Sequence, residues 1–273
     1  MRTQNEKAVA FRALHQGPGA FVIPNPWDAG SARLLAGLGF QALATSSWAS
    51  AAVCGRRDGS LTRAEALAQF SAIAGAVDLP VAADLGNGYG HDPATAAETI
   101  RAAGAAGLVG GSIEDATGEP ARPLDEFSLA VERVAASAAA ARKLPFPFML
   151  TARTEGFVRG RPDLDETIRR LQAFEKAGAD VLFAPGLPDL AAVRAVCAAV
   201  SKPVNFMAGV KGRSFPVAEL AAAGVRRISV AASFYRAAMT GLLDAAREVR
   251  EHGTFGYIDR TAPSAEFEQL MGW

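Results

Sequence analysis

The sequence predicts an α/β protein, a (β/α)8 TIM barrel followed by a C-terminal helical tail. Eight short apolar or β-branched runs recur along the 273 residues, and stretches with helical spacing separate them. Several of these stretches end in a glycine just before the next run, as at Gly39, Gly104, Gly178 and Gly224, where helices commonly stop. A doubly wound open sheet is the main alternative, but it does not usually need eight evenly recurring strands.

The eight expected strands follow one another at regular intervals. Each is a short apolar or β-branched run, and the first is ended by Pro24. The runs are 20–24, 42–45, 81–84, 107–114, 148–153, 181–184, 204–207 and 227–231. In a barrel built from them, the carboxyl ends of all the strands lie on one face of the molecule.

Helical spacing fills the intervals between these strands. The expected helices are 6–15, 30–37, 63–77, 93–103, 124–143, 164–177, 190–200, 217–223 and one around 240–251. No linker or shift in composition divides the chain before about residue 252, so residues 1–252 are expected to form one barrel domain and residues 253–273 a helical tail. Phe267, Leu270 and Met271 form an apolar stripe on a short helix in this tail, which packs on its own barrel or on a partner subunit.

Opposite charges balance in this sequence, with 28 Lys and Arg against 28 Asp and Glu. No net field would recruit nucleic acid or an anionic membrane, so a small molecule is the expected partner. No apolar stretch approaches the ~20 residues that a membrane span requires. Cys54 and Cys197 have no CxxC spacing and the first residues are too polar for a signal peptide, so we expect a cytoplasmic protein whose thiols are small apolar fillers.

Polar side chains stand at the carboxyl ends of most of the expected strands. Asp84 ends one strand and opens a loop with glycines at 86, 88 and 90, where backbone can approach a ligand closely. The other strand ends carry Asn25, Thr45, Ser46, Ser47, Glu114, Asp115, Arg153, Thr154, Glu155 and Asn205. Because barrel enzymes use the carboxyl ends of their strands, these side chains are expected to meet at one mouth.

Asp84, Glu114 and Arg153 together suit a metal ion and an acid substrate. Mg²⁺ takes a few carboxylates and keeps several waters, whereas arginine binds the carboxylate of an oxo acid. The alternative is that Glu114 and Arg153 form an ion pair at the barrel rim and that Asp84 only caps a loop. Tyr89, in the glycine loop, either offers a hydroxyl to a substrate or packs without a catalytic role.

The three histidines have no spacing typical of a metal site. His15 and His252 lie near the ends of expected helices and are expected at the surface. His91 directly follows Gly90 and is a weaker candidate for a place in the mouth.

Six short motifs stand in order along roughly residues 20–235. They are PNPWDAGSA at 24–32, TSS at 45–47, GRRDG at 55–59, ADLGNGYG at 83–90, SIED at 112–115 and TART at 151–154. In this order they resemble the isocitrate lyase and phosphoenolpyruvate mutase superfamily, and six motifs in register argue against chance. The resemblance implies a Mg²⁺-dependent barrel enzyme for 2-oxo and 2-hydroxy acids. It also makes a homo-oligomer, a dimer or tetramer that exchanges a C-terminal helix between subunits, the expected assembly.

The resemblance also assigns roles position by position. Asp84 and Glu114 match the residues that hold the Mg²⁺, which chelates the substrate's carboxylate and 2-oxo oxygens. Arg153 matches the arginine that neutralises the developing oxyanion, and Asp58 matches a loop aspartate near metal and substrate. The matching substrate-binding positions are Ser46 and Ser47 for the carboxylate, Trp48 as a pocket wall and, as a weaker correspondence, Asn205.

Two departures from the superfamily pattern bear on activity. Gly86 stands where a second aspartate is usual, which implies a weaker or more hydrated metal site. The segment 115–123, where lyases of the isocitrate type carry a cysteine, contains no cysteine, lysine or histidine. The thiol route to isocitrate or methylisocitrate cleavage therefore has no visible agent.

These residues predict a Mg²⁺-dependent lyase or decarboxylase that acts on a small 2-oxo or 2-hydroxy dicarboxylate through a metal-stabilised enolate. Decarboxylation fits best because it needs no cysteine acid. Within the superfamily, the alternative is phosphorus–carbon bond chemistry on phosphonopyruvate, with Arg122, Arg159 and Arg161 as further cations. An alternative of another class is a barrel without metal that binds a ligand or serves in assembly.

Overall fold

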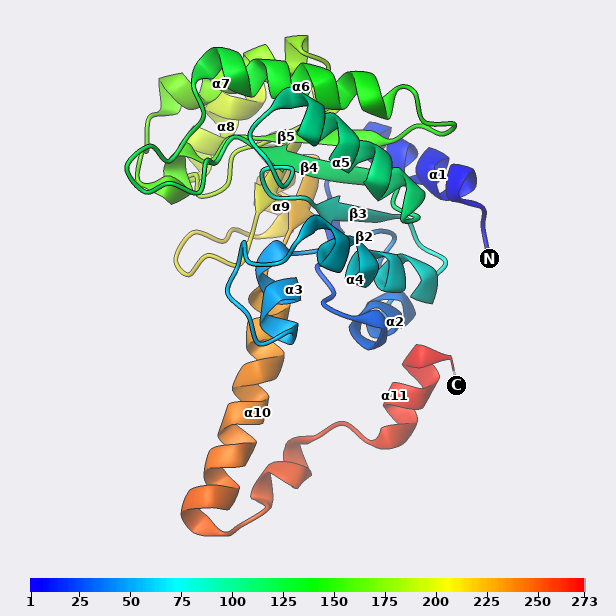
Figure 1. The fold of residues 1–273 in the computed structure, drawn as a ribbon. Coiled ribbons are helices and arrows are strands. Elements are labelled where there is room, and N and C mark those ends of the chain that lie inside the picture. Colours follow the sequence, from blue (N-terminus) through cyan, green and yellow to red (C-terminus); the bar gives the residue numbers. More distant parts are fainter. Residues whose placement is uncertain (273) are drawn as a thin grey trace.

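The computed structural model describes residues 1–272, which form the expected barrel and a helical arm (Figure 1). All eight strands pair in parallel, in the order β1-β8-β7-β6-β5-β4-β3-β2. Each lies within its predicted run, so the predicted fold class is confirmed. The strands are β1 Phe21–Ile23, β2 Leu43–Ala44, β3 Val81–Asp84, β4 Gly110–Glu114, β5 Met149–Arg153, β6 Val181–Phe183, β7 Val204–Met207 and β8 Arg227–Ser229.

Helices separate the strands along the chain, and most of them cover the outside of the sheet. They are α1 Gln4–Gln16, α2 Ala29–Gly37, α3 Ser47–Val53, α4 Arg63–Ala76, α5 Pro93–Ala105, α6 Phe127–Ala141, α7 Leu164–Lys176, α8 Leu190–Ala199, α9 Val217–Ala222, α10 Ser233–His252 and α11 Ser264–Met271, with 3-10 helices η1 Gly156–Arg159 and η2 Gly256–Arg260. Two differ from prediction. α10 begins well before the expected start, and α3 was not predicted because its short Ser- and Ala-rich sequence has no apolar period.

Side-chain caps begin several of the helices. Thr3 and Glu6 form a reciprocal capping box at the start of α1, and Asp28 forms one with Ser31 at the start of α2. Such caps satisfy backbone N–H groups that have no partner inside the helix. Asp28, which the sequence places just beyond the first strand, therefore serves the local structure of α2.

The barrel closes at the seam between β1 and β2. Ala44 N donates to Pro24 O at 3.0 Å, and Asn25 Nδ2 donates to Thr45 O at 2.8 Å. Asn25 Oδ1 accepts from Val230 N at 2.9 Å. One buried amide thus joins the ends of β1, β2 and β8, which explains a polar residue at this strand end.

An apolar plug fills the inner base of the barrel. Phe11 of α1 is fully buried there and packs with Val109, Met149 and Val181, which stand at or beside the first residues of β4, β5 and β6. A separate and larger apolar layer lies between the sheet and the surrounding helices. Because the plug closes the base, the polar inward positions of the barrel lie above it, toward the carboxyl ends of the strands.

α10 projects from the barrel as an arm, and α11 returns to lie beside α2 (Figure 1). None of the side chains of α10 is buried, and Leu242 and Leu243 are 60% and 51% exposed. The predicted tail helix 264–271 is thus present and contacts its own chain, whereas Trp273 lies outside the described residues. No helix within residues 1–272 is long and apolar enough to span a bilayer.

Candidate active site

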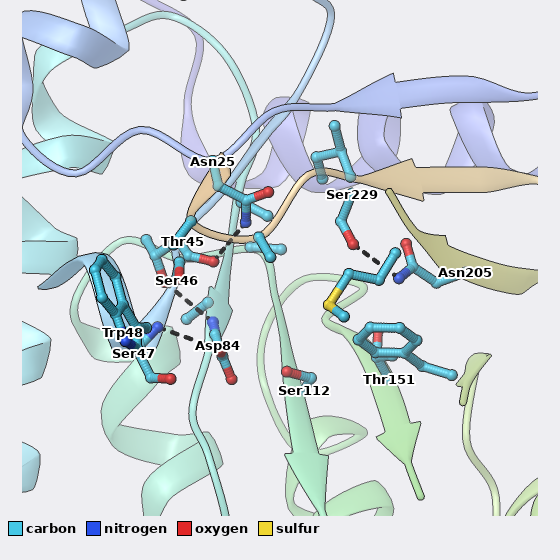
Figure 2. Close-up of a pocket in the computed structure, with 18 of the residues that line it drawn as sticks. Asn25, Thr45, Ser46, Ser47, Trp48, Asp84, Ser112, Thr151, Asn205 and Ser229 are labelled. Atoms are coloured by element: carbon cyan, nitrogen blue, oxygen red, sulfur yellow. Dashed lines mark hydrogen bonds between the residues drawn. The ribbon is translucent and has the colours of Figure 1, made fainter. Parts of the chain in front are cut away.

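A cavity of about 410 Å³ opens above the apolar plug, and every strand of the barrel contributes to its lining. Polar and charged side chains make up much of this lining, several of them labelled in Figure 2. They are Asn25, Thr45, Ser46, Ser47, Asp58, Asp84, Ser112, Thr151, Arg153, Asn205, Arg227, Ser229, Ser233 and Arg236. Part of the predicted convergence on one mouth is therefore observed, whereas four of the predicted strand-end residues do not line the cavity: Glu114, Asp115, Thr154 and Glu155.

Asp84 ends β3 with its carboxylate at the cavity wall. Its backbone N–H donates to Thr45 Oγ1 at 3.0 Å, while its Oδ2 accepts from Ser47 N at 3.2 Å (Figure 2). Its Oδ1 accepts from Gly86 N at 3.3 Å and lies 3.7 Å from Arg153 Nη1. The carboxylate is thus oriented by backbone donors from the start of α3 and from the glycine loop, and is balanced by one guanidinium.

Arg153 ends β5 and lies among three carboxylates. Its Nε is 2.5 Å from Glu155 Oε1 and 3.4 Å from Glu114 Oε2, and its guanidinium lies 5.0 Å from the centre of the Phe183 ring. Burial by itself lowers the pKa of Arg153, but the charges of Glu114, Glu155 and Asp84 outweigh burial and raise it. Arg153 is therefore a permanent cation, held in place at the cavity wall.

Glu114 lies behind Arg153 and is not among the residues that line the cavity. Its carboxylate lies 3.4 Å from Arg153 and 3.5 Å from Nη2 of Arg159. Together with Asp115 and Arg133 it borders a small enclosed space instead. Burial raises the pKa of Glu114, and Arg153 opposes this rise. The ion pair that the sequence left open as an alternative is thus present.

α3 and the loop after it supply the outer wall of the cavity. Ser46 caps α3 through a 3.4 Å bond from Ala49 N to its hydroxyl, and it lines the cavity with Ser47, Trp48 and Asp58. Trp48 is 43% exposed, and its ring packs edge-on against Tyr235 of α10 with centroids 5.7 Å apart. Desolvation at the mouth, followed by the charge of Asp84, raises the pKa of Asp58.

The inner end of the cavity contains residues that sequence reasoning mostly missed. Asn205, which was predicted, donates from Nδ2 to Ser229 Oγ at 3.0 Å (Figure 2). Beside it, Arg227 Nε donates to Asn205 Oδ1 at 2.8 Å, and Arg227 Nη2 donates to Thr151 Oγ1 at 2.9 Å. Arg227 begins its strand, so attention to strand ends alone passes over it. The signal available was its place two residues before Ser229, on the same face of a period-2 strand.

Two other predicted positions differ from expectation. Tyr89 is not among the cavity-lining residues and packs on the outer apolar layer with a left-handed backbone of φ 61°, but its pKa is raised by burial and by the charges of Asp84 and Asp58. The expectation that His15 is exposed was wrong, because His15 is only 3% exposed and its ring lies between Phe11 and Phe21. Position near a helix end says little here, because that end of α1 lies under the barrel.

Gly86 has a φ of 54°, and a Cβ added there would meet no atom within 4 Å. Within residues 1–272, no cluster of three or more His, Cys, Asp or Glu side chains has the geometry of a metal site.

The three arginines expected to bind a phosphonate also lie outside the cavity lining. Arg159 pairs with Glu114 and Glu155, and Arg122 and Arg161 border a separate loop cavity.

The barrel and its cavity define a TIM-barrel protein with a small polar site that contains one buried and one half-buried arginine and has carboxylates toward its mouth. The chain belongs to the phosphoenolpyruvate phosphomutase family, whose model matches residues 11–250. It is accordingly an enzyme of the phosphoenolpyruvate mutase and isocitrate lyase superfamily of lyases and mutases, which confirms the resemblance deduced from the motifs.

Three similar proteins illustrate what the chain resembles within this superfamily. A candidate lyase/mutase from Burkholderia cenocepacia J2315, of known structure, is 50% identical with a TM-score of 0.96, and the match covers 99% of this chain and 98% of that one. Oxaloacetate decarboxylase of Bradyrhizobium diazoefficiens is 34% identical over 74% of this chain and 70% of its own length. The structure of oxaloacetate acetylhydrolase in complex with the product oxalate is 26% identical with a TM-score of 0.88, over 99% and 95% of the two chains.

Proposed function

We propose that this protein is a Mg²⁺-dependent carbon–carbon lyase or decarboxylase of a small 2-oxo or 2-hydroxy dicarboxylate, such as oxaloacetate. The observation that carries the proposal is the pair of Asp84 and Arg153, 3.7 Å apart on one cavity wall. No cysteine, lysine or histidine of the described chain lines that cavity. Two of the relatives named above have oxaloacetate in their names, which supports the same substrate class.

The carboxylates at the mouth suit a Mg²⁺ ion that is bound by few protein ligands. Asp84 and Asp58 both line the cavity, and the charge of Asp84 helps to raise the pKa of Asp58, a repulsion that a cation would relieve. Mg²⁺ commonly binds through one or two carboxylates and keeps waters and substrate oxygens as its other ligands. Asp84 would hold the ion with Asp58, while Glu114 stays bound to two arginines. When bound, the metal would polarise the 2-oxo group.

The side chains of this chain would carry the remaining steps. Arg153 is a fixed cation that stabilises the enolate formed when the bond to the departing carboxylate breaks and CO₂ leaves with no added oxidant or reductant. The carbon that lost CO₂ would take up one proton from water at the open mouth of the cavity, because Asp58 would be committed to the metal as a carboxylate. The hydroxyls of Ser46 and Ser47 border the same space and would orient the carboxylate that remains.

Replacing Arg153 with glutamine tests this assignment. The Arg153→Gln variant should lose about 10²–10³-fold in kcat for oxaloacetate, because a preorganised cation at the developing oxyanion is removed. The assay compares 2-oxo and 2-hydroxy dicarboxylates and phosphonopyruvate, with Mg²⁺ and with a chelator. Arg161→Gln, a loop arginine outside the cavity, is the matched control. Undiminished turnover in Arg153→Gln, or no turnover of any dicarboxylate by the native protein, would count against the proposal.

Gly86→Asp tests the metal site separately. There is open space for its side chain, and aspartate tolerates a left-handed backbone better than most residues, so the variant should fold. Its added carboxylate should tighten Mg²⁺ binding in the presence of oxalate by about tenfold, as measured by calorimetry. Gly118→Asp, at another open left-handed glycine, is the control. Equal Mg²⁺ affinity in Gly86→Asp and the native protein would remove position 86 from the metal site.

Phosphorus–carbon chemistry is the second candidate, supported by the family match. The site supports this chemistry less well, because the arginines expected to bind the phosphonate do not line the cavity: Arg122, Arg159 and Arg161. A ligand-binding or assembly role without metal is the candidate from another class. Absence of metal-dependent oxalate binding at millimolar Mg²⁺ would favour that role over both enzymatic ones.

A further inference from the structure

Arg227 is a buried cation with no carboxylate partner in residues 1–272. The residue is 6% exposed, and its guanidinium bonds to Asn205 Oδ1, Thr151 Oγ1 and, at 3.4 Å from Nη1, to His15 Nε2. His15 Nδ1 is 2.8 Å from Phe11 O, so it donates there and leaves Nε2 as the acceptor for Arg227. The neighbours from β5, β7 and α1 are therefore all neutral.

The lack of a countercharge has an energetic consequence. Burying a charge is costly unless an opposite charge or a full set of hydrogen bonds compensates it. A guanidinium has five N–H donors, and the three bonds above leave one on Nη1 and one on Nη2 without a protein acceptor. Burial alone lowers the pKa of Arg227 to about 9, and no carboxylate counteracts this. An anion from outside would supply the missing partner.

The same arginine lines the cavity, so such an anion has a route to it. The carboxylates of the site lie at the other end: Glu114, Glu155 and Asp84 surround Arg153, and Asp58 is at the mouth. Figure 2 shows Asn205 and Thr151, which accept from Arg227, and Ser229, which accepts from Asn205, on the side of the cavity opposite Ser47 and Trp48. The cavity is thus polarised, with acidic groups at its mouth and an unpaired cation at its inner end.

We propose that Arg227 binds a second anionic oxyacid group of the substrate, with Asn205 and Thr151 fixing the guanidinium. The substrate is then a dianion whose 2-oxo end lies near Arg153 and whose second acidic group reaches Arg227. The placement of the 2-oxo end rests on the proposed function, but binding at Arg227 does not require turnover. The second group is a carboxylate or a phosphonate, since a guanidinium pairs with either.

Calorimetry with two ligands of equal length tests this site. Succinate and butyrate differ only in that one end is a carboxylate or a methyl group, and titrations are done with Mg²⁺ and with a chelator. The native protein should bind succinate at least about tenfold more tightly than butyrate, and Arg227→Met should bind the two alike. Arg227→Lys should keep part of the difference. No preference for succinate in the native protein, or an equal preference in Arg227→Met, would overturn the proposal.

A second variant covers the case in which Arg227→Met fails to fold. In the native protein Arg227 Nε lies 2.8 Å from the amide oxygen of Asn205. Asn205→Asp keeps the shape of this side chain and places a carboxylate against Arg227. It should fold, as followed by thermal melting, and lose the preference for succinate because the cation is already paired. A folded Asn205→Asp protein that keeps the full preference would overturn the proposal.

Two further measurements distinguish the possible outcomes. Replacing succinate with 3-phosphonopropionate shows whether the inner end prefers a phosphonate, through tighter binding that also depends on Arg227. Turnover of oxaloacetate is measured in parallel with the native protein. Binding of succinate that depends on Arg227, without turnover of oxaloacetate, would reject the proposed function and retain this binding site. Turnover of oxaloacetate with no effect of Arg227 on binding would retain the proposed function and reject this binding site.

Discussion

Arg153 and Arg227 lie in one cavity but have opposite surroundings. Arg153 has three carboxylates around it, which keep it charged and fixed, whereas Arg227 has only neutral neighbours. Residue type therefore does not decide what a buried arginine does. The number of acids packed against it decides whether it completes an internal ion pair or remains available for a ligand.

His15, which contacts Arg227, makes stability depend on pH. Burial first, then the charge of Arg227, lowers its pKa from 6.5 to about 3. The unfolded chain takes up a proton on His15 near pH 6.5, but the folded chain does not. The contribution of neutral His15 to the free energy of unfolding is therefore fully present above this pH and is lost as the pH falls toward 3. Relative to His15→Gln, the native free energy of unfolding should drop by about 2 kcal/mol between about pH 6.5 and about pH 5.

Urea unfolding at several pH values measures this difference. His252→Gln, which replaces an exposed histidine at the end of α10, is the control for loss of an imidazole. Parallel curves for the native protein and His15→Gln would show that His15 titrates normally in the folded state.

At the scale of elements, Arg133 of α6 links the glycine loop to the rest of the barrel. Its side chain is 1% exposed, and its guanidinium pairs with Asp125 and donates to Asn87 O. It also donates to Gly90 O at 3.2 Å and to Glu114 O at 3.4 Å. One helix side chain thus holds the loop that follows Asp84, so the position of the candidate metal site depends on packing far from the ligand.

Arg133→Met should destabilise the protein by about 3–5 kcal/mol, because it leaves Asp125 buried without its partner. Urea denaturation measures the change. Adding Asp125→Asn to this variant should restore part of the loss, since the unpaired charge is removed. Arg101→Met, which breaks an exposed pair with Glu98, should cost under about 1 kcal/mol. Similar losses for Arg133→Met and Arg101→Met would refute the anchoring role.

At the scale of the whole molecule, the arm carries apolar surface that no other part of the same chain covers. Leu242 and Leu243 of α10, and Phe255 and Ile258 beyond it, are each more than half exposed. Apolar surface gathered on one projecting element is typical of an interface between subunits. We propose that a second copy of the chain covers it, in keeping with the homo-oligomer expected from sequence.

Deleting residues 253–273 should therefore reduce the particle mass measured by light scattering. Leu243→Glu, which places a charge on the exposed face of α10, should act in the same direction without shortening the chain. Arg250→Glu, a change from one charged side chain to another on the same helix, serves as the control for altered charge. An unchanged mass after both the deletion and Leu243→Glu would mean that the arm does not hold subunits together.

The sequence by itself determined the eight strands, most helices and the residues of the outer mouth. These follow from local patterns: short apolar runs, glycine stops and polar residues such as Asp84 and Arg153 at strand ends. The motif order also indicated the superfamily correctly, and the family match confirmed it. Asp58 and Trp48 came from that resemblance, because nothing local directs a loop residue into a cavity.

Only the tertiary structure decided which inward residues share a level of the barrel. Strand pairing aligns Arg153 with Phe183, Phe183 with Asn205 and Asn205 with Arg227. Strands in a closed barrel are staggered, so the start of β8 lies level with the end of β5. This stagger depends on pairing between residues distant in the chain. It also explains why Arg227 was missed at a strand start.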